Sequence, residues 1–547
     1  MVQLESFKRP RAALLPLLAS VFIVTVYNQA FWRQFVAATG GLTPGAIPVQ
    51  AGMFLMLVST FTASLAVLNF RFSIKPLLIA LFLLTSLSSY FMDHYGVAID
   101  WSMVQNIIET DARESVELLN LGMLATFVLT GVLPSVAVAW SKPRYPSARR
   151  QLGLNLATAG IAVTGAGLLL MLMFKTLAPA LREHRELRFL LTPTNYIQAV
   201  NGYFKRQRST PVVVAPLGSD ATKGVLWRGN GRRTVTLMVV GETARAANFS
   251  LNGYGRLTNP ELSQVPDLVN FRNMQSCGTA TGISLPCLFS PLGRENFSAA
   301  KAQSQEGLLD VLRHAGLSVV WRDNNSGCKG VCDRIAYEDV SRPVAGDPLC
   351  NDEECYDERL LRGLPQLIRQ ASGDMVIVLH QKGSHGPAYS KRYPPQFNVF
   401  GPACTTIALG QCSRESIIAA YDNTIRYTDH VLNKAIEMLA RAAREDGVDT
   451  ALMYFSDHGE SLGENNFYLH GTPYVISPPE QRAVPFMLWL SEGFRERFRI
   501  DQRCLVARAD QPFNHDYLFH STLGMLDVST AVYNPRLDIF NACRHAP

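Results

Sequence analysis

Five long apolar runs lie in the first third of this 547-residue chain, and they constrain its fold more than any other feature. A helix needs about 20 consecutive apolar residues to cross the hydrocarbon core of a bilayer. The runs approach that length and lie at residues 12–36, 49–69, 76–91, 119–140 and 152–174. We therefore expect an amino-terminal domain of five transmembrane helices.

Basic residues mark one side of this predicted membrane domain. Clusters of Lys and Arg precede the first run, separate the second from the third, and separate the fourth from the fifth. Cytoplasmic loops are enriched in these residues, so we expect the amino terminus in the cytoplasm. An odd number of crossings then places everything after residue 176 outside. The net charge of +6 reflects this topology, and we do not expect nucleic-acid binding.

All ten cysteines lie in the second half of the chain, between Cys277 and Cys543. Disulfides persist outside the cytosol, and an even number of cysteines confined to one region indicates a disulfide framework. The alternative is a set of buried free thiols, which we favour less because free thiols need not respect a domain boundary. The cysteines therefore indicate an oxidising compartment, on the side that the basic residues also predict.

The loop between the third and fourth runs, residues 94–117, is expected on the same outer side. Its apolar residues follow helical spacing, and Asn106, Thr110 and Glu114 recur every four residues on another face. Taken alone, this polar face is more typical of the solvated surface of an interfacial helix than of a binding site.

We divide the chain into a membrane domain (residues 1–176), a connecting region (177–233) and a soluble domain (234–547). Residues 176–208 are rich in Leu, Arg and aromatic residues and are interrupted at Pro193, which favours a helical bridge on the bilayer surface. Residues 210–233 contain repeated Pro and Gly and indicate a linker.

The soluble domain shows strands that alternate with helices. Apolar runs at 234–240, 375–379 and 451–455 predict buried strands, and helical patterns lie between them, for example at 305–314 and 416–442. This alternation predicts a parallel sheet in an α/β domain. Ligands bind beyond the carboxyl ends of such strands, and polar clusters follow all three.

These polar clusters contain good ligands for a divalent metal. Glu242 follows the first strand, and Asp457 and His458 follow the third. Thr281 lies in a Thr- and Ser-rich segment between Cys277 and Cys287, which could pair. If Thr281 opens a helix, the helix N-terminus stabilises an anionic phosphoryl group, and a metal activates the hydroxyl as a nucleophile. Each element alone is weak: Glu242 by itself could be an ordinary surface carboxylate.

Five motifs together resemble the lipid A phosphoethanolamine transferases, a family that includes the transferable colistin-resistance enzymes. They are Val-Gly-Glu-Thr-Ala-Arg from Val240, Ser-Cys-Gly-Thr-Ala-Thr from Ser276, Trp-Arg-Asp-Asn-Asn from Trp321, His-Gln-Lys-Gly-Ser-His-Gly-Pro-Ala-Tyr from His380, and Ser-Asp-His-Gly-Glu-Ser-Leu-Gly-Glu-Asn from Ser456. The resemblance covers essentially the whole chain. It implies that the soluble domain has an alkaline-phosphatase/sulfatase-type fold.

The resemblance also implies roles for individual residues. Those matching the zinc site are Glu242, Thr281, Asp457 and His458, with Thr281 as the nucleophile that becomes modified by phosphoethanolamine. Those matching the substrate site are Asn325, Lys329, His385 and His470, and either histidine would protonate the leaving oxygen. Those matching lipid contacts are Asn106, Thr110 and Glu114, which reverses the interpretation of that face as solvated.

The cysteines are expected to pair in sequence order, as Cys277–Cys287, Cys328–Cys332, Cys350–Cys355, Cys404–Cys412 and Cys504–Cys543. Some members of the family lack an equivalent of Cys328–Cys332. The resemblance further implies phosphatidylethanolamine as donor, lipid A as acceptor, one tightly bound zinc ion with a second left open, and a monomer. We expect a bacterial inner-membrane protein with its catalytic domain in the periplasm.

Other functions remain open at this stage. A sulfatase-like phosphodiesterase would pass the group to water, and a glycerol-phosphate transferase of the lipoteichoic acid synthase type also has five spans and a threonine nucleophile. We would not expect the latter to carry this cysteine framework. A non-enzymatic membrane sensor would require a missing nucleophile or ligand, and none is missing. The acceptor position, the 1- or 4′-phosphate of lipid A or a core sugar, is not specified.

Overall fold

The computed structural model describes residues 12–97, 99, 101–109, 119–183, 187–207, 214–228, 231–351, 353–406 and 409–544. The chain separates into two compact units. One contains Met1–Val104 and Leu119–Gly202, and the other contains Gln105–Leu118 and Tyr203–Pro547. We call the first the membrane unit and the second the catalytic unit, and each is described by itself.

The membrane unit is helical. Among the described residues, four helices are long and apolar enough to cross a bilayer, and a bent pair supplies a fifth span if it is counted as one. The bent pair is α1 (Leu14–Val26) and α2 (Gln29–Ala38), which meet at 67°. The other helices are α3 (Ile47–Val67), α4 (Ile74–Tyr95), α7 (Leu121–Thr126) continuing through a π-helical segment (Phe127–Val132) into α8 (Leu133–Trp140), and α9 (Ala148–Glu183).

Asn28 breaks the first apolar run, which the sequence predicts as one helix. Its buried side chain donates from Nδ2 to the carbonyl of Ile23 (2.9 Å) and to that of Thr192 (3.0 Å). The Asn28 Oδ1 atom also accepts a hydrogen bond from the Thr192 amide at 2.9 Å. The orphaned backbone groups of a helix end need such partners, and here one side chain supplies them. Apolarity alone does not reveal this break, because the run continues on both sides of it.

Helix α9 carries a large exposed apolar surface. Within its span Ala148–Met173, an 18-residue window has a mean hydropathy of 2.0 and no buried residue. Met171 and Leu172 are 79% and 74% exposed. A soluble protein rarely exposes so large a continuous apolar surface, whereas a helix that faces lipid requires one.

The helical bridge that we predicted at residues 176–208 begins later in the structure than in the prediction. Helix α9 continues without interruption to Glu183 rather than ending at residue 174, and the shorter helices α10 (Leu187–Leu190) and α11 (Thr194–Gln207) follow. In the loop before α7, helix α5 spans Trp101–Glu109. The side chains of Asn106, Thr110 and Glu114 lie outside the described residues, so their predicted lipid contacts stay predictions.

The catalytic unit is built on an eight-stranded sheet in the order β11-β3-β10-β7-β2-β6-β4-β5. The central pairs β7-β2, β2-β6 and β6-β4 are parallel, as the sequence predicts. Strand β10 is the exception, because it runs antiparallel to both β3 and β7. The strands are β2 (Thr234–Gly241), β3 (Val269–Gln275), β4 (Ser318–Asp323), β5 (Ala336–Asp339), β6 (Met375–His380), β7 (Asp449–Ser456), β10 (Ala483–Leu490) and β11 (Phe513–Asn514).

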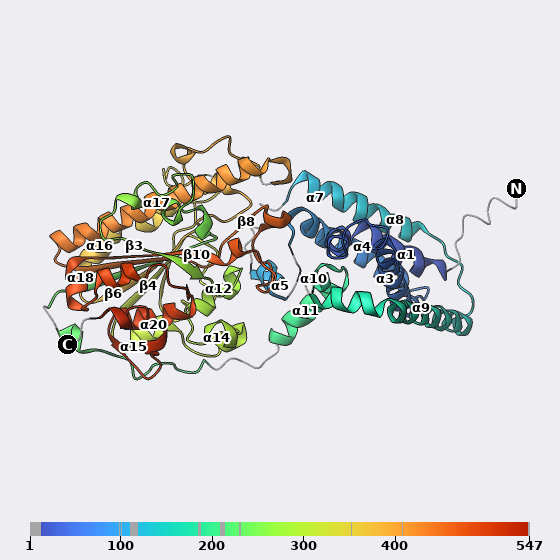
Figure 1. Ribbon diagram of the computed structural model, residues 1–547, viewed down its shortest axis with the longest axis horizontal. Coiled ribbons are helices and arrows are strands. Elements are labelled where there is room, and N and C mark those ends of the chain that lie inside the picture. The colour runs from blue at the N-terminus through green and yellow to red at the C-terminus, as the bar shows by residue number, and fades with distance from the viewer. Residues whose placement is uncertain are drawn as a thin grey trace. The chain divides into compact units, whose positions relative to one another are not determined.

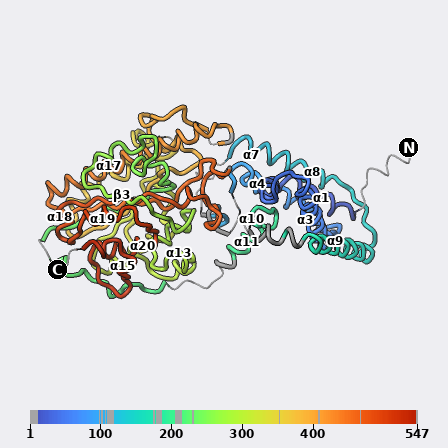
Figure 2. Tube along the Cα trace, viewed as in Figure 1, coloured from blue at the N-terminus to red at the C-terminus, as the bar shows by residue number. Residues whose placement is uncertain are grey.

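Helices cover both faces of the sheet. Figure 1 shows α17 (Arg414–Glu445) along one face and α12 (Thr281–Leu288), α15 (Leu308–His314) and α20 (Asp516–Met525) along the other. One buried apolar cluster joins these last three helices to the sheet. Every residue of β2 and of β7 is buried, as expected for parallel strands covered on both sides. The segment near the carboxyl terminus, red in Figure 2, returns to the sheet edge, where β11 pairs with β3.

Part of the predicted linker is folded onto the catalytic unit. Strand β1 (Thr222–Lys223) pairs with β12 (Val528–Ser529), and the ring centroids of Trp227 and Phe498 lie 5.2 Å apart. Gly218 has a φ of 62°, and a Cβ there would lie 2.9 Å from Val311. This glycine therefore serves close packing and a left-handed backbone rather than flexibility.

Five disulfides join all ten cysteines. The pairs follow sequence order: Cys277–Cys287, Cys328–Cys332, Cys350–Cys355, Cys404–Cys412 and Cys504–Cys543. The first of them links the segment before α12 to the body of that helix. The bond thereby closes a short loop around Thr281.

Candidate active site

Three buried side chains meet where two neighbouring strands end. Glu242 follows β2, and Asp457 and His458 follow β7, the strand beside it. All three are almost fully buried. One ligand atom from each lies within 4.8 Å of the others, which is the spacing that a single metal ion requires. The parallel pairing of β2 and β7 therefore produces the cluster that the sequence predicts.

Thr281 lies against this cluster. It is the first residue of α12, after Ala280 in an extended conformation. Its hydroxyl lies 3.1 Å from both carboxylate oxygens of Glu242 and 3.2 Å from Nε2 of His458. The first N–H groups of a helix have no carbonyl partner within it, so a helix start is a favourable setting for a phosphoryl group.

The donor set fits a zinc ion. The Nδ1 atom of His458 lies 2.9 Å from the carbonyl of Gly459, which can only accept, so Nδ1 carries the hydrogen and Nε2 is left to bind a metal. That Nε2 lies 3.4 Å from Glu242 and 3.3 Å from Asp457. Oδ2 of Asp457 is buried without a hydrogen-bond partner among the described residues. Two carboxylates and an imidazole nitrogen are common zinc ligands, and they leave a fourth position that a hydroxyl can fill.

The electrostatics of the cluster require a positive charge. Burial and, to a smaller extent, the charge of Glu242 raise the pKa of Asp457 to about 6. Burial lowers the pKa of His458, but Asp457 and Glu242 outweigh burial and bring it to about 10. Burial also raises the pKa of Glu242, but contact with His458 holds it well below its usual value. A proton on His458 balances the carboxylates here, and a divalent cation would do so more fully.

Thr243 donates hydrogen bonds to the carboxylates of both Glu242 and Asp457, a role that the sequence does not predict. Its amide donates to Oδ1 of Asp457 (3.2 Å), and its hydroxyl donates to Oε1 of Glu242 (2.6 Å). The residue has a φ of 59°, which is uncommon for threonine, and Tyr421 donates to its carbonyl at 2.7 Å. A positive φ at a non-glycine residue leaves no simple signal in a sequence.

Asn325, predicted in the substrate site, lies directly behind Glu242. Its Nδ2 atom donates to Oε2 of Glu242 at 2.8 Å and to the carbonyl of Gln381 at 2.9 Å. Its amide donates to Asp323, which also lies 3.0 Å from His380 and accepts a hydrogen bond from Trp321. The buried pair Asp323 and His380 was not predicted as part of the site, although both residues lie within the quoted motifs.

The two predicted histidines lie together beside the metal ligands. The ring of His470 has its centroid 4.5 Å from that of His458 and 5.3 Å from that of His385. Nδ1 of His470 lies 2.8 Å from Oε2 of Glu460, whose other oxygen accepts from the hydroxyl of Tyr389 at 2.5 Å. Sequence reasoning missed Glu460 and Tyr389. Glu460 follows His458 by two residues, which was the available signal.

Lys329 adopts a left-handed backbone, with a φ of 52°, inside the loop closed by Cys328 and Cys332. Its amine donates to the carbonyl (3.3 Å) and to the hydroxyl (3.2 Å) of Ser326, which follows Asn325 directly. The short disulfide loop thus holds Lys329 near Asn325, the residue that supports Glu242.

Comparison with known proteins assigns the whole chain. Residues 57–208 match a family model described as phosphoethanolamine transferase EptA/EptB, and residues 234–528 match the sulfatase family. The chain is 41% identical to phosphoethanolamine transferase EptA of Escherichia coli K12, covering 98% of both chains. It is 36% identical to phosphatidylethanolamine transferase Mcr-1 of Escherichia coli over 93% of this chain and 94% of that one.

The chain belongs to the phosphoethanolamine transferase family. The structure of the integral membrane transferase EptA from Neisseria meningitidis superimposes with a TM-score of 0.93 at 33% identity, covering 98% of this chain and all of that one. The soluble domain of phosphoethanolamine transferase EptC from Campylobacter jejuni is 40% identical and covers 61% of this chain, with a TM-score of 0.52. The predicted family and fold class are confirmed, and the protein is a phosphoethanolamine transferase anchored in a membrane.

Proposed function

We propose that this transferase moves phosphoethanolamine from phosphatidylethanolamine to a phosphate of lipid A, with Thr281 as the covalent carrier. The observation that carries the proposal is the hydroxyl of Thr281, which lies within 3.2 Å of both Glu242 and His458. Two relatives are named for these substrates: Mcr-1 is a phosphatidylethanolamine transferase, and a more distant Escherichia coli relative is a Kdo(2)-lipid A phosphoethanolamine 7''-transferase.

Glu242, Asp457 and His458 would hold a zinc ion, with the Thr281 hydroxyl as the fourth ligand. Bound there, the ion would lower the pKa of that hydroxyl and balance the charge of the phosphoryl group. The chain itself contributes the geometry. Asn325 and Thr243 fix the two oxygens of Glu242, and Thr243 also holds Asp457.

In the first displacement, the oxygen of Thr281 attacks phosphorus, and the bond from phosphorus to the diacylglycerol oxygen breaks. That leaving oxygen takes a proton from His385 or His470. His470 has its Nδ1 engaged by Glu460, so its Nε2 is the nitrogen that exchanges protons with substrate. In the second displacement, a lipid A phosphate oxygen attacks the phosphothreonine and regenerates the hydroxyl. One covalent intermediate implies ping-pong kinetics.

The membrane topology gives this reaction its setting. We infer that the catalytic unit lies in the periplasm, on the outer side of the bacterial inner membrane, where a disulfide framework is stable. Both substrates are lipids, so a membrane anchor keeps the catalytic residues near them. The added ethanolamine brings an amine to a phosphate, which would weaken the binding of polymyxin and other cationic peptides to the modified surface.

The carrier role of Thr281 is tested in cells that lack other transferases of this kind. Cells that make Thr281→Ala should show no phosphoethanolamine on lipid A by mass spectrometry, at normal protein levels. Thr281→Ser should retain part of the activity, because it keeps a hydroxyl. With phosphatidylethanolamine alone, the purified wild type should carry one phosphoethanolamine on Thr281. Wild-type levels of modified lipid A with the alanine variant would refute the mechanism, and free phosphoethanolamine in place of modified lipid would indicate a hydrolase.

A further inference from the structure

Arg392 is a charged residue in the interior of the catalytic unit that the reaction outlined above does not use. Its side chain has no solvent exposure, which is unusual for arginine. It follows a short 3-10 helix (Tyr389–Lys391), and its contacts include a backbone carbonyl and a carboxylate. Its Nε donates to the backbone carbonyl of His385 at 2.8 Å, and its NH1 is paired with a carboxylate oxygen of Glu354.

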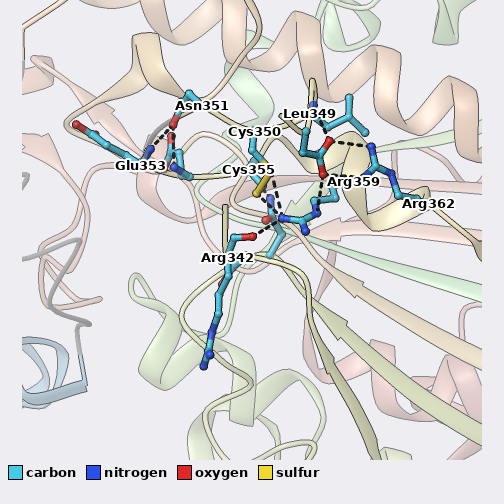
Figure 3. Close-up of a disulfide and its surroundings, with 12 residues drawn as sticks. Arg342, Leu349, Cys350, Asn351, Glu353, Cys355, Arg359 and Arg362 are labelled. Atoms are coloured by element: carbon cyan, nitrogen blue, oxygen red, sulfur yellow. Dashed lines mark hydrogen bonds and ion pairs between the residues drawn. A yellow bond between two sulfur atoms is a disulfide. The ribbon is translucent and has the colours of Figure 1, made fainter. Parts of the chain in front are cut away.

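Glu354 belongs to a loop that a disulfide and a backbone hydrogen bond tie together. Cys350 and Cys355 close the loop as a disulfide, and the Asn351 amide donates a hydrogen bond to the carbonyl of Glu354 at 2.9 Å. Arg359 reaches both sulfur atoms, at 3.2 Å from Cys350 and 2.6 Å from Cys355, as Figure 3 shows. The loop therefore presents the carboxylate of Glu354 at a fixed place.

The same loop is anchored to the end of strand β4. The carbonyl of Cys355 accepts a hydrogen bond from Nδ2 of Asn324 at 2.9 Å, and Asn324 directly precedes the Asn325 that supports Glu242. A continuous set of contacts therefore runs from the strand end through the disulfide loop to Glu354, Arg392 and the backbone of His385. The side chain of His385 in turn lies beside His470.

We propose that Arg392, held by Glu354, is a positioning residue that fixes His385 in the site for transfer. This inference rests on the proposed function, because it assumes that His385 acts on the substrate. Arginine suits the role because its planar guanidinium donates to a carboxylate and a carbonyl at once, in fixed directions. Lysine keeps the charge but presents a point donor on a flexible chain, so it would hold Glu354 and release His385.

The chain provides a matched control in Arg497. Its side chain is 3% exposed, its Nε lies 3.1 Å from Asp449, and its NH2 donates to the carbonyl of Arg232 at 2.6 Å. It thus has the same combination of a carboxylate and a backbone carbonyl as Arg392. Asp449 begins β7, at the opposite end of the strand from Asp457. Arg497→Lys therefore reports the structural cost of the same substitution without any role for His385.

The test compares turnover of the full-length protein in detergent, with phosphatidylethanolamine that carries a fluorescent acyl chain and with lipid A as acceptor. Arg392→Lys should lower kcat on the order of 10-fold with little change in KM, because a displaced catalytic group slows reaction without removing a substrate contact. Arg497→Lys should change kcat by less than about 2-fold. Glu354→Gln, which keeps an acceptor for the guanidinium, should give a smaller loss of kcat than Arg392→Lys and serves if that variant unfolds.

The decisive measurement is a double-mutant cycle with His385→Ala. If Arg392 acts through His385, the double variant should turn over as slowly as His385→Ala alone. A loss equal to the product of the two single losses would overturn the positioning role and leave the proposed function intact. Full activity of His385→Ala would overturn it as well, and would remove His385 from the mechanism while Thr281 kept its role.

Discussion

The two ends of strand β7 each carry a fully buried aspartate, and the two are balanced in opposite ways. Asp449, at the start, has Arg232 at 3.3 Å and Arg497 at 3.1 Å. Asp457, just past the end, accepts hydrogen bonds from the amides of Thr243 and His458, and its other oxygen lies 3.3 Å from Nε2 of His458. Arginines therefore supply the counter-charge of the first carboxylate, and an imidazole lies against the second.

This difference shows how one scaffold separates stability from function. A buried carboxylate costs several kcal/mol unless a charge compensates it. At the start of β7 the protein supplies that charge permanently through arginines. At the carboxyl end of the sheet it supplies hydrogen bonds and titratable imidazoles, and we infer that a bound cation completes the compensation. Burial alone therefore does not distinguish a structural aspartate from a metal ligand, whereas the source of its counter-charge does.

Replacing each aspartate by asparagine should separate the two ends most clearly. Asp457→Asn should lower transfer on the order of 10³-fold or more, because it removes a metal ligand, with little effect on folding. Asp449→Asn should lower the free energy of unfolding by about 3–5 kcal/mol, because it leaves the buried Arg497 without its carboxylate, while folded molecules keep their turnover. Lipid A modification and thermal unfolding measured on both variants check this. Similar effects at the two positions would contradict the distinction.

Removal of the metal should affect the carboxyl end of β7, where Asp457 lies, and not the end with Asp449. Treatment with a chelator should abolish transfer, and added Zn²⁺ should restore it. A ligand at a hundredfold excess over its Kd stabilises the folded state by about 2.7 kcal/mol, so Zn²⁺ should raise Tm of the stripped wild type. Asp449→Asn should show the same rise from its lower starting point, and Asp457→Asn should show almost none. An equal rise in both variants would place the zinc elsewhere.

Asp429, on α17, offers a third case with a smaller effect. It is buried and accepts hydrogen bonds from the amides of Glu261 (2.9 Å) and Leu262 (3.1 Å). Burial and, to a smaller extent, the charge of Glu261 raise its pKa from 3.8 to about 7. Between these two values the unfolded chain has released the proton that the folded protein keeps. Stability from this group is therefore present below pH 4 and is lost as pH rises toward 7.

Asp429→Asn should remove this dependence of the free energy of unfolding on pH. Between pH 4 and pH 7 the wild type should lose on the order of 2 kcal/mol relative to the variant, with unchanged transfer at neutral pH. Thermal unfolding of both proteins across this range, followed by tryptophan fluorescence, measures the difference. A constant gap between the two curves would show that Asp429 titrates normally and that its amide partners suffice to keep it charged.

The sequence predicts those parts of the site that depend on strand ends. Glu242, Asp457 and His458 each follow an apolar run, and parallel pairing necessarily brings such positions to one edge of the sheet. Thr281 was predicted from a helix start between two cysteines. The five apolar runs also predict the membrane unit, except where the side chain of Asn28 ends α1.

The parts that the sequence does not predict depend on contacts between distant residues. Tyr389 and Glu460 are 71 residues apart, and nothing in either segment indicates that they share a hydrogen bond. Arg392 reaches Glu354 across 38 residues, and its burial is known only once the loop is folded. Strand β10 looks like any other apolar run, so its antiparallel direction depends on where the chain re-enters the sheet. Thr243 adopts its positive φ because Tyr421, Glu242 and Asp457 hold it on three sides.

The order of the disulfides bears on how the protein is made. The five pairs are separated by 10, 4, 5, 8 and 39 residues, and none encloses or crosses another. A chain threaded amino terminus first into an oxidising compartment presents its thiols one after another. The next thiol to emerge after each unpaired cysteine is then its native partner. Oxidation that keeps pace with export therefore reaches the native connectivity without slow disulfide rearrangement, and the catalytic unit can mature as it arrives.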